Sequence, residues 1–115
     1  MKKKFKIAVS DTVIVTVKAT IADAGGKPVP HKFSLTCERR SADEMKDQMD
    51  SSFNVKTFLK EVTTGWEGQR LVLNEDDGKP AEFDSDALDE LLNISGLAMV
   101  CFVAYGNQVT AQAKN

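Results

Sequence analysis

The stretch TVIVTVKATIADAGGKPVPHKFSLTCE, residues 12–38, decides the fold of this chain. Its first part alternates apolar residues with mainly polar ones, as a strand with one buried face does. The central GGKP run, residues 25–28, has the composition of a tight turn, and the alternation then resumes. The stretch therefore predicts a long antiparallel β-hairpin, one face of which needs covering. The expected inward residues are Val13, Val15, Val17, Ala19, Ile21, Phe33, Leu35 and Cys37.

The residues before the hairpin continue the same period. Phe5, Ile7 and Val9 alternate with Lys4, Lys6 and Ala8, which predicts a short half-buried strand over residues 4–9. Ser10 and Asp11 interrupt it. A strand pattern in place of an apolar signal core also argues against a secretory leader.

After the hairpin, the spacing of apolar residues becomes helical. Ser41 and Glu44 form a capping-box sequence that opens a short helix reaching about Asp50. A second helix is expected near residues 54–60, and Asp84 is expected to cap a third that ends at Asn93. The apolar positions of these helices are Ala42, Met45, Met49, Val55, Phe58, Leu59, Val62, Leu88, Leu91 and Leu92.

The run LAMVCFVAY, residues 97–105, is apolar throughout and must be hidden in the core or against a partner. A continuous run of this kind suits either a buried strand or a buried helix. Leucine, alanine and methionine at its start, Ser95 as a cap and the Gln/Ala-rich tail favour helix. Such a helix is either sandwiched in the centre of the fold or half exposed as an interaction surface.

These elements predict an α+β fold in a single domain, residues 1–115. Residues 1–40 form a long antiparallel β-hairpin or small sheet, packed with three to four short helices. Residues 41–115 are mainly helical, with a small strand at residues 71–73 and a solvated acidic turn at residues 74–80. Trp66, the single tryptophan, is expected to fill a core corner with its N–H hydrogen-bonded.

Composition limits the class of protein. The chain is 42% apolar and 28% charged, with a net charge of −2, as in a globular protein. Residues 1–40 carry a charge of +6 and residues 41–115 carry −8, which suits steering of a partner or attraction between copies. Cys37 and Cys101 lie in apolar patterns, as free thiols do in a reducing compartment. The apolar run is less than half the ~20 residues of a membrane span, so we expect a cytoplasmic protein without a membrane segment.

No catalytic or ligand-binding motif emerges. His31 is the single histidine, and nothing near it completes a nucleophile–base arrangement. The acidic turn fails as a calcium loop, because Gly78 as sixth residue puts Leu73 first and Asp84 twelfth. There is no zinc spacing, phosphate loop or basic stripe for nucleic acid. We expect no enzyme activity, metal, cofactor or nucleic acid.

The order of the pieces resembles the small tail assembly chaperones of long-tailed bacteriophages and prophages. The resemblance rests on residues 25–29 (GGKPV), 58–66 (FLKEVTTGW), 83–92 (FDSDALDELL), 104–105 (AY) and 114–115 (KN), and spans nearly the whole chain. Their order and spacing are the specific part. The chain departs from the pattern near Asp11, where a proline is expected, and at residues 94–96, where a Tyr-Pro-Gly-like entry is expected. These departures affect which subgroup of these chaperones the chain resembles more than the resemblance to the family.

The resemblance implies a non-enzymatic factor of phage morphogenesis that works in the host cytoplasm. It would coat the apolar tape measure protein, help recruit tail tube protein, and expose apolar surface to a client helix. Residues suited to that contact, although also suited to a core, are Met45, Met49, Trp66, Leu88, Leu92, Phe102 and Tyr105. The alternative is a structural tail component, a tube or completion subunit that self-assembles into a homo-oligomer through its hairpin. A small-ligand module has only the generic α+β pattern in its favour.

Overall fold

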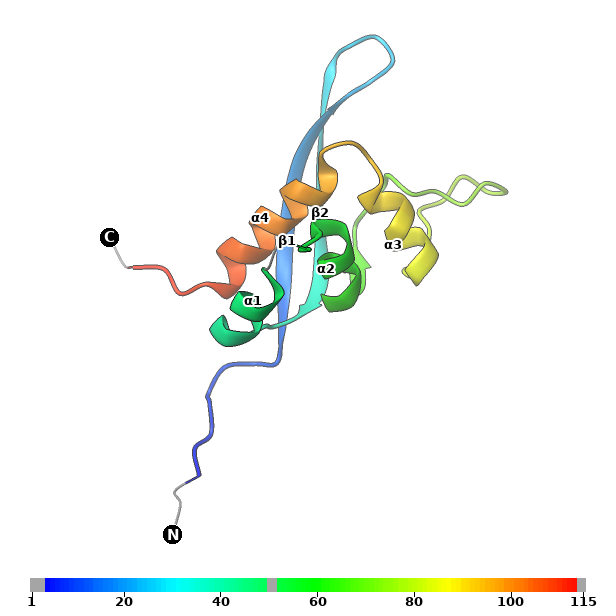
Figure 1. Cartoon of the computed structure of the whole chain (residues 1–115). Helices are drawn as coiled ribbons and strands as arrows, with labels where there is room; N and C mark the ends of the chain where they lie inside the picture. The colour runs from blue at the N-terminus through cyan, green and yellow to red at the C-terminus, as the bar shows by residue number, and fades with distance from the viewer. Residues whose placement is uncertain (1–3, 50–51, 114–115) are drawn as a thin grey trace.

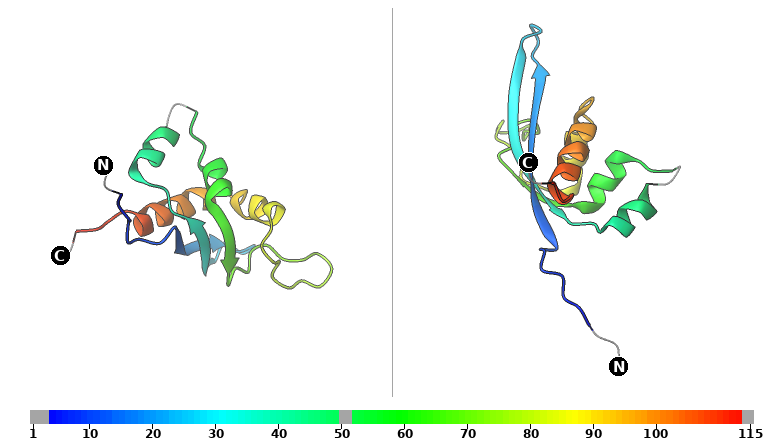
Figure 2. Two further views of the ribbon diagram at one scale, coloured as in Figure 1. Left: turned by 90° about the horizontal axis from the view of Figure 1, so that it is seen from below. Right: turned by 90° about the vertical axis from the view of Figure 1, so that its left-hand side faces the viewer.

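Two eleven-residue strands, β1 (Thr12–Ala22) and β2 (Pro28–Glu38), form the predicted hairpin. The short strand β3 (Thr63–Glu67) pairs antiparallel with the end of β2, so the sheet order is β1-β2-β3. The computed structural model describes residues 4–49 and 52–113, and it places the helices on one side of this sheet (Figures 1 and 2). The α+β prediction is confirmed.

The hairpin turn is built by Asp23 and Gly26. The Asp23 carboxylate accepts hydrogen bonds from the backbone N–H groups of Gly25 and Lys27, both at 2.9 Å. Gly26 has a φ of 81°, a left-handed conformation that glycine adopts without strain. The turn composition therefore fixes the register of the long strands.

The hydrogen bonds from β1 to β2 come from its odd-numbered residues along the whole hairpin. The Arg39 N–H donates to the Asp11 carbonyl at 2.8 Å, and the Asp23 N–H donates to the Lys27 carbonyl at 2.9 Å, at the two ends of one unshifted register. Because hydrogen-bonded pairs alternate in an antiparallel ladder, the odd-numbered residues of β1 bond to β2. The even-numbered residues direct their N–H and C=O groups away from β2. Pro28 and Pro30 oppose even-numbered residues, so their missing N–H groups do not interrupt the hairpin.

Four helices follow. α1 (Ala42–Gln48) has the predicted capping box, and α2 (Val55–Val62) begins after Asn54, whose side chain accepts from Thr57 N–H. α3 (Ser85–Leu92) begins at the predicted cap Asp84 and ends at the predicted Asn93. α4 (Leu97–Val109) confirms the helical interpretation of the apolar run. Asp50, the expected end of the first helix, lies outside the described residues.

The core lies between the sheet and the helices. It takes the predicted inward side of the hairpin and the apolar sides of α2, α3 and α4. Phe58 of α2 packs edge-on against Phe102 and Tyr105 of α4, with ring centroids 5.6 and 5.3 Å apart. The buried apolar residues are Val15, Val17, Phe33, Leu35, Cys37, Phe58, Leu59, Val62, Ala87, Leu88, Leu91, Leu92, Leu97, Cys101 and Tyr105.

Three local predictions are wrong. Residues 4–9 form no strand and are exposed, because no neighbouring strand pairs with them. Ser95 does not cap α4; the cap is Gly96, whose φ of 83° supplies the sharp entry and which makes no side-chain bond. Residues 71–73 form no strand: Leu73 makes a single antiparallel β-bridge with Pro80, on the other side of the acidic loop, and the pairing extends no further.

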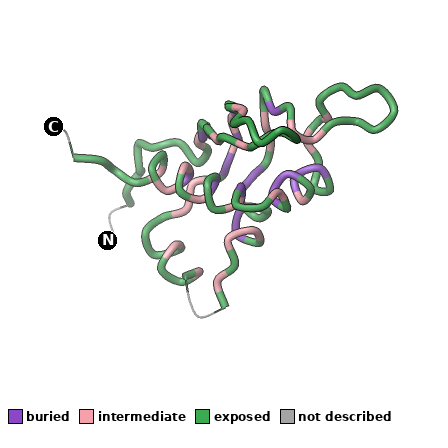
Figure 3. The backbone as a smooth tube through the Cα atoms, turned by 90° about the horizontal axis from the view of Figure 1, so that it is seen from above, coloured by how far each residue is buried: buried purple, intermediate pink, exposed green. Residues whose placement is uncertain are grey.

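Two segments project from the body. The hairpin tip extends beyond the helices, and the arm of residues 4–9 projects from the opposite end (Figure 1). The molecule measures 64 × 33 × 31 Å and has a radius of gyration of 16.5 Å, against about 13 Å for a compact domain of this length. The arm and the acidic loop are exposed over their described length (Figure 3).

Candidate interaction surfaces

α4 has one buried side and one exposed apolar side. Leu97, Cys101 and Tyr105 recur at four-residue spacing and are buried. On the opposite side, Met99, Val100 and Val103 are 53%, 37% and 53% exposed. We call these three residues the α4 patch. An apolar helix with an open side offers a surface that another apolar helix can cover.

The flanks of α4 differ. Phe102 faces α2, since its ring lies 5.4 Å from Phe53 and 5.6 Å from Phe58. At about 100° per residue, Val100 and Ala104 lie on the opposite flank, away from α2. α4 packs against β1 and extends past the outer edge of that strand (Figures 1 and 2). The flank of Val100 and Ala104 therefore faces the space beside β1.

The outer edge of β1 is the second open surface. β1 is the terminal strand of the sheet, and in the described part of the chain no other strand pairs with its outer side. Its even-numbered residues, including Ile14, Thr16 and Lys18, present free N–H and C=O groups there. Lys18 is the single charged residue among its eleven, and β1 contains no proline. We call this side the β1 edge.

The predicted partner-binding residues divide into two groups. Leu88, Leu92 and Tyr105 are buried, so they are not available to a partner in this conformation. The residues that retain accessible surface are Met45, Met49, Trp66 and Phe102, of which Met49 is the most exposed. Met45 lies on α1 and Met49 directly after it, Trp66 lies on β3, and Phe102 lies on α4.

Trp66 occupies the predicted corner. Its indole N–H donates to the Ala81 carbonyl at 3.2 Å, and its ring packs edge-on against Phe83 at 5.3 Å. Gln69 secures the same corner by bonding the Val72 and Ala81 carbonyls. Sequence reasoning missed Gln69, whose polar side chain gave no sign of burial. It also missed Met99, Val100 and Val103, because a uniformly apolar run has no period that separates its sides.

No catalytic arrangement accompanies these surfaces in the described residues. His31 and Cys37 lie six residues apart on β2, which is about 20 Å in an extended strand. Both thiols are free and buried, and burial raises the pKa of the Cys101 thiol to about 12, so it stays protonated at neutral pH. No group of three or more metal-ligating side chains gathers in the described part of the chain.

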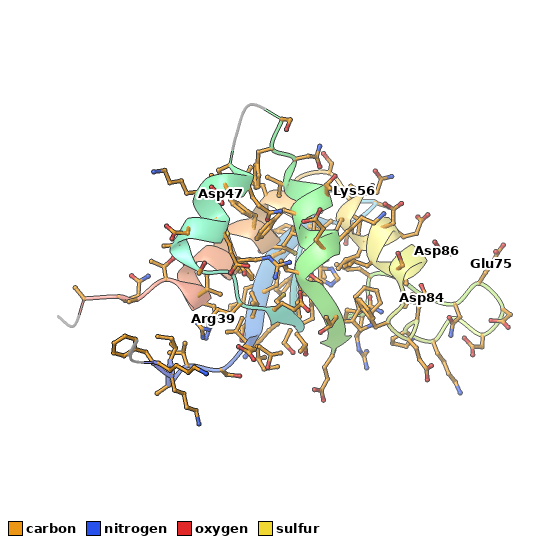
Figure 4. All side chains as sticks on the ribbon, turned by 60° about the horizontal axis from the view of Figure 1, so that its bottom comes forward. Arg39, Asp47, Lys56, Glu75, Asp84 and Asp86 are labelled. Atoms are coloured by element: carbon orange, nitrogen blue, oxygen red, sulfur yellow. The ribbon has the colours of Figure 1, made fainter. Side chains whose placement is uncertain are left out.

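Acidic residues of the loop and of α3 line one open hollow of about 650 Å³, but they form no metal-ligating group in the described residues. Glu75 lies at the outer end of the acidic loop, away from Asp84 and Asp86 at the start of α3 (Figure 4). Asp84 is used as the α3 cap, and Asp77 accepts from Lys79 N–H within the loop. This arrangement agrees with a solvated turn followed by a helix start.

A small cleft separates α1 from α2. Its volume is about 330 Å³, and the Gln48 amide spans the helices by donating to Glu61 at 2.9 Å. Its lining mixes acidic, amide and phenyl groups and contains no nucleophile–base pair. The lining residues are Asp47, Gln48, Ser52, Phe53, Asn54, Thr57, Phe58 and Glu61.

In the described part of the chain, no single helix is both long and apolar enough to cross a membrane, and α3 with α4 would meet that requirement only as a pair bent by 104°. Comparisons of the chain with protein-family models, with curated proteins and with solved structures find no match. Any functional conclusion therefore depends on the surfaces described above and on the order of the sequence motifs.

Proposed function

We propose that this protein is a non-enzymatic tail assembly chaperone of a long-tailed bacteriophage or prophage, acting in the host cytoplasm. Its client is the long, apolar, helical tape measure protein, and tail tube protein is the second partner. The observation that carries the proposal is the α4 patch of Met99, Val100 and Val103, open on the side of α4 opposite the core.

The chemistry of the patch suits a helical client. Three apolar side chains within five residues of one helix form a stripe against which an apolar side of another helix can pack. Met99 adds a flexible thioether that adapts to different neighbouring side chains, as a chaperone of a long and variable client requires. Burial of such surface is favourable whatever the detailed client sequence.

The test is co-expression of this chain with the long helical product of the neighbouring locus, with soluble client as the measurement. Val103→Asp places a charge in the α4 patch without entering the core, because Val103 is 53% exposed. We expect the unmodified chain to keep the client soluble and Val103→Asp to lose most of that effect. Phe102→Asp and Leu92→Asp are less useful, because they would disrupt the packing of α2, α3 and α4.

The matched control is Ala42→Asp, which adds the same charge to the exposed first turn of α1, where acids favour a helix. This variant should protect the client as the unmodified chain does. Equal client solubility with unmodified chain and Val103→Asp would overturn the role of the patch. An insoluble client in the presence of the folded unmodified chain would overturn the chaperone proposal.

The β1 edge supports the alternative, a self-assembling tail tube or completion subunit. A free edge of eleven residues with one lysine and no proline is an uncommonly open site for strand pairing. The alternative requires ordered rings or tubes of the purified chain alone, visible by electron microscopy. The chaperone role requires no such array.

A further inference from the structure

We propose that the β1 edge binds the N-terminal arm, residues 4–9, of a second copy of this chain, which adds to the sheet as a short strand. This inference concerns self-association and does not depend on the proposed client. It rests on the sequence of the arm, on the open edge, and on the backbone that connects them.

The arm has a strand sequence with no strand partner of its own. Phe5, Ile7 and Val9 are 85%, 73% and 56% exposed, although their alternation with Lys4, Lys6 and Ala8 is that of a half-buried strand. In the described residues, these three side chains are not part of the core or of the apolar layer around it. Three large apolar side chains on one side of an extended segment favour a covering partner.

The arm cannot reach the edge of its own β1 by a tight turn. A two-residue hairpin loop at Ser10 and Asp11 requires a positive φ, and no described residue other than glycine has one. Arg39 also holds both residues in line with β1, because its backbone N–H donates to the Asp11 carbonyl and its Nε to the Ser10 carbonyl. A longer loop would remove Val9 from the strand. The β1 edge open to the arm is therefore that of another copy.

The β1 edge fits this segment. Its outward N–H and C=O groups belong to even-numbered residues, whose side chains lie on the solvent face of the sheet. Residues directly opposite each other on paired strands point to the same face of the sheet. A register that places Phe5, Ile7 and Val9 opposite odd-numbered residues of β1 therefore puts them on the helix-covered face. There they would meet the flank of α4 that carries Val100 and Ala104, because α4 packs against β1 and its C-terminal end extends past that strand (Figure 2).

The proposed contact involves few charges. α4 carries no charged residue. The only charged residue of β1 is Lys18, which would repel Lys4 or Lys6 if it lay directly opposite either of them. Registers that keep Lys18 apart from both arm lysines are available.

The first experiment is sedimentation of the full chain, with any tag at the C-terminus, over a wide range of concentration. We expect concentration-dependent association that Ile7→Asp abolishes. The matched control Ala8→Asp puts the same charge on the other side of the arm and should associate as the unmodified chain does. A monomeric unmodified chain, or equal association of Ile7→Asp, would overturn the proposal.

Amide hydrogen exchange locates the contact without altering β1. In the associated protein, the outward amides of Ile14, Thr16 and Lys18 should be protected, and in Ile7→Asp they should exchange rapidly. Val15 and Val17 donate within the hairpin and should remain protected in both proteins. Rapid exchange of the outward amides in the associated protein would place the contact elsewhere and overturn the proposal. Protection in a monomer would show the arm on its own β1 and overturn it equally.

Mixing two defective variants tests the pairing of arm with edge directly. Thr16→Pro removes one outward N–H but none of the hairpin bonds, and Thr16→Ala is its control. Ile7→Asp retains the edge and folded Thr16→Pro retains the arm, so each should be monomeric alone and their mixture should form a 1:1 dimer. Failure of the folded variants to combine would overturn the arm-to-edge pairing.

Discussion

The phenol of Tyr105 joins α4 to the end of β2, because its hydroxyl donates to the Glu38 carbonyl at 2.8 Å and accepts from the Arg40 N–H at 3.0 Å. Arg39, between these residues, donates to the Val109 carbonyl at the last turn of α4. These hydrogen bonds therefore satisfy two backbone groups at the end of β2 and one carbonyl group at the end of α4.

Tyr105→Phe should destabilise the fold by about 1–3 kcal/mol, since the Glu38 carbonyl and Arg40 N–H lose a partly buried partner. The measurement is the free energy of unfolding in denaturant. Thr64→Val is the control, because it deletes an exposed hydroxyl bonded to the Thr36 carbonyl and should change stability by less than about 0.5 kcal/mol. Equal effects of the two variants would contradict this account of the junction.

Gly96→Ala and Gly106→Ala should shift stability in opposite directions. A Cβ meets no atom within 4 Å at either position, so only backbone conformation distinguishes them. Gly96 has a φ of 83°, and alanine there should destabilise by about 1–2 kcal/mol. Gly106 lies within α4, and alanine there should stabilise by about 0.5–1 kcal/mol. Thermal unfolding of both variants measures this difference, and shifts of the same sign would contradict it.

Asp84→Ala should destabilise α3 by about 0.5–2 kcal/mol, because the Asp84 carboxylate accepts from the Ala87 N–H at 2.7 Å. Ser85→Ala changes the next, exposed residue and is expected to alter stability by less than about 0.5 kcal/mol. Denaturant unfolding compares the two. An unchanged midpoint for Asp84→Ala would show that the cap contributes nothing measurable.

The free energy of unfolding should fall at alkaline pH, partly because of the Cys101 thiol. Burial raises the pKa of this thiol from 9.0 to about 12, so the unfolded chain releases its proton first. The folded state then binds more protons between pH 9.0 and about 12, and the free energy of unfolding declines as pH rises through that window. The decline from this thiol is at most about 1.4 kcal/mol per pH unit.

Cys101→Ala should therefore show a shallower alkaline decline than the unmodified protein, whatever its stability at neutral pH. Some decline should remain, because burial also raises the pKa of Cys37 and of Tyr105. Denaturant unfolding at several pH values measures both slopes. Identical slopes would show that Cys101 does not titrate differently in the two states.

The hairpin was predictable because a period of two identifies the buried face and the turn residues fix the register. The same reasoning failed for residues 4–9, since alternation indicates which face would be buried but not whether a neighbouring strand exists. Ser95 failed as a cap because the entry to α4 needs a positive φ, which Gly96 supplies one residue later. Helix starts at Ser41 and Asp84 were correct because capping is local.

The candidate surfaces were less predictable than the fold. Leu88, Leu92 and Tyr105 were suited both to a partner contact and to a core, and they lie in the core, because α3 and α4 pack on α2 and on β1. Met99, Val100 and Val103 remain open because no element covers that side of α4 in the described chain. Which side of an apolar helix stays uncovered depends on tertiary packing, which no local pattern records.

Pro28 and Pro30 make the outer edge of β2 differ from the outer edge of β1 in its capacity to form hydrogen bonds. Their nitrogens lie on the side away from β1, beyond the short β3, so near the tip that side cannot donate a regular set of hydrogen bonds. Growth of the sheet by strand addition is therefore directional: it can proceed from β1 but is terminated near the tip of β2. Because the arm of one copy and the β1 edge of the next are different surfaces, repeated addition would run head to tail and would form an open chain unless it closed into a ring.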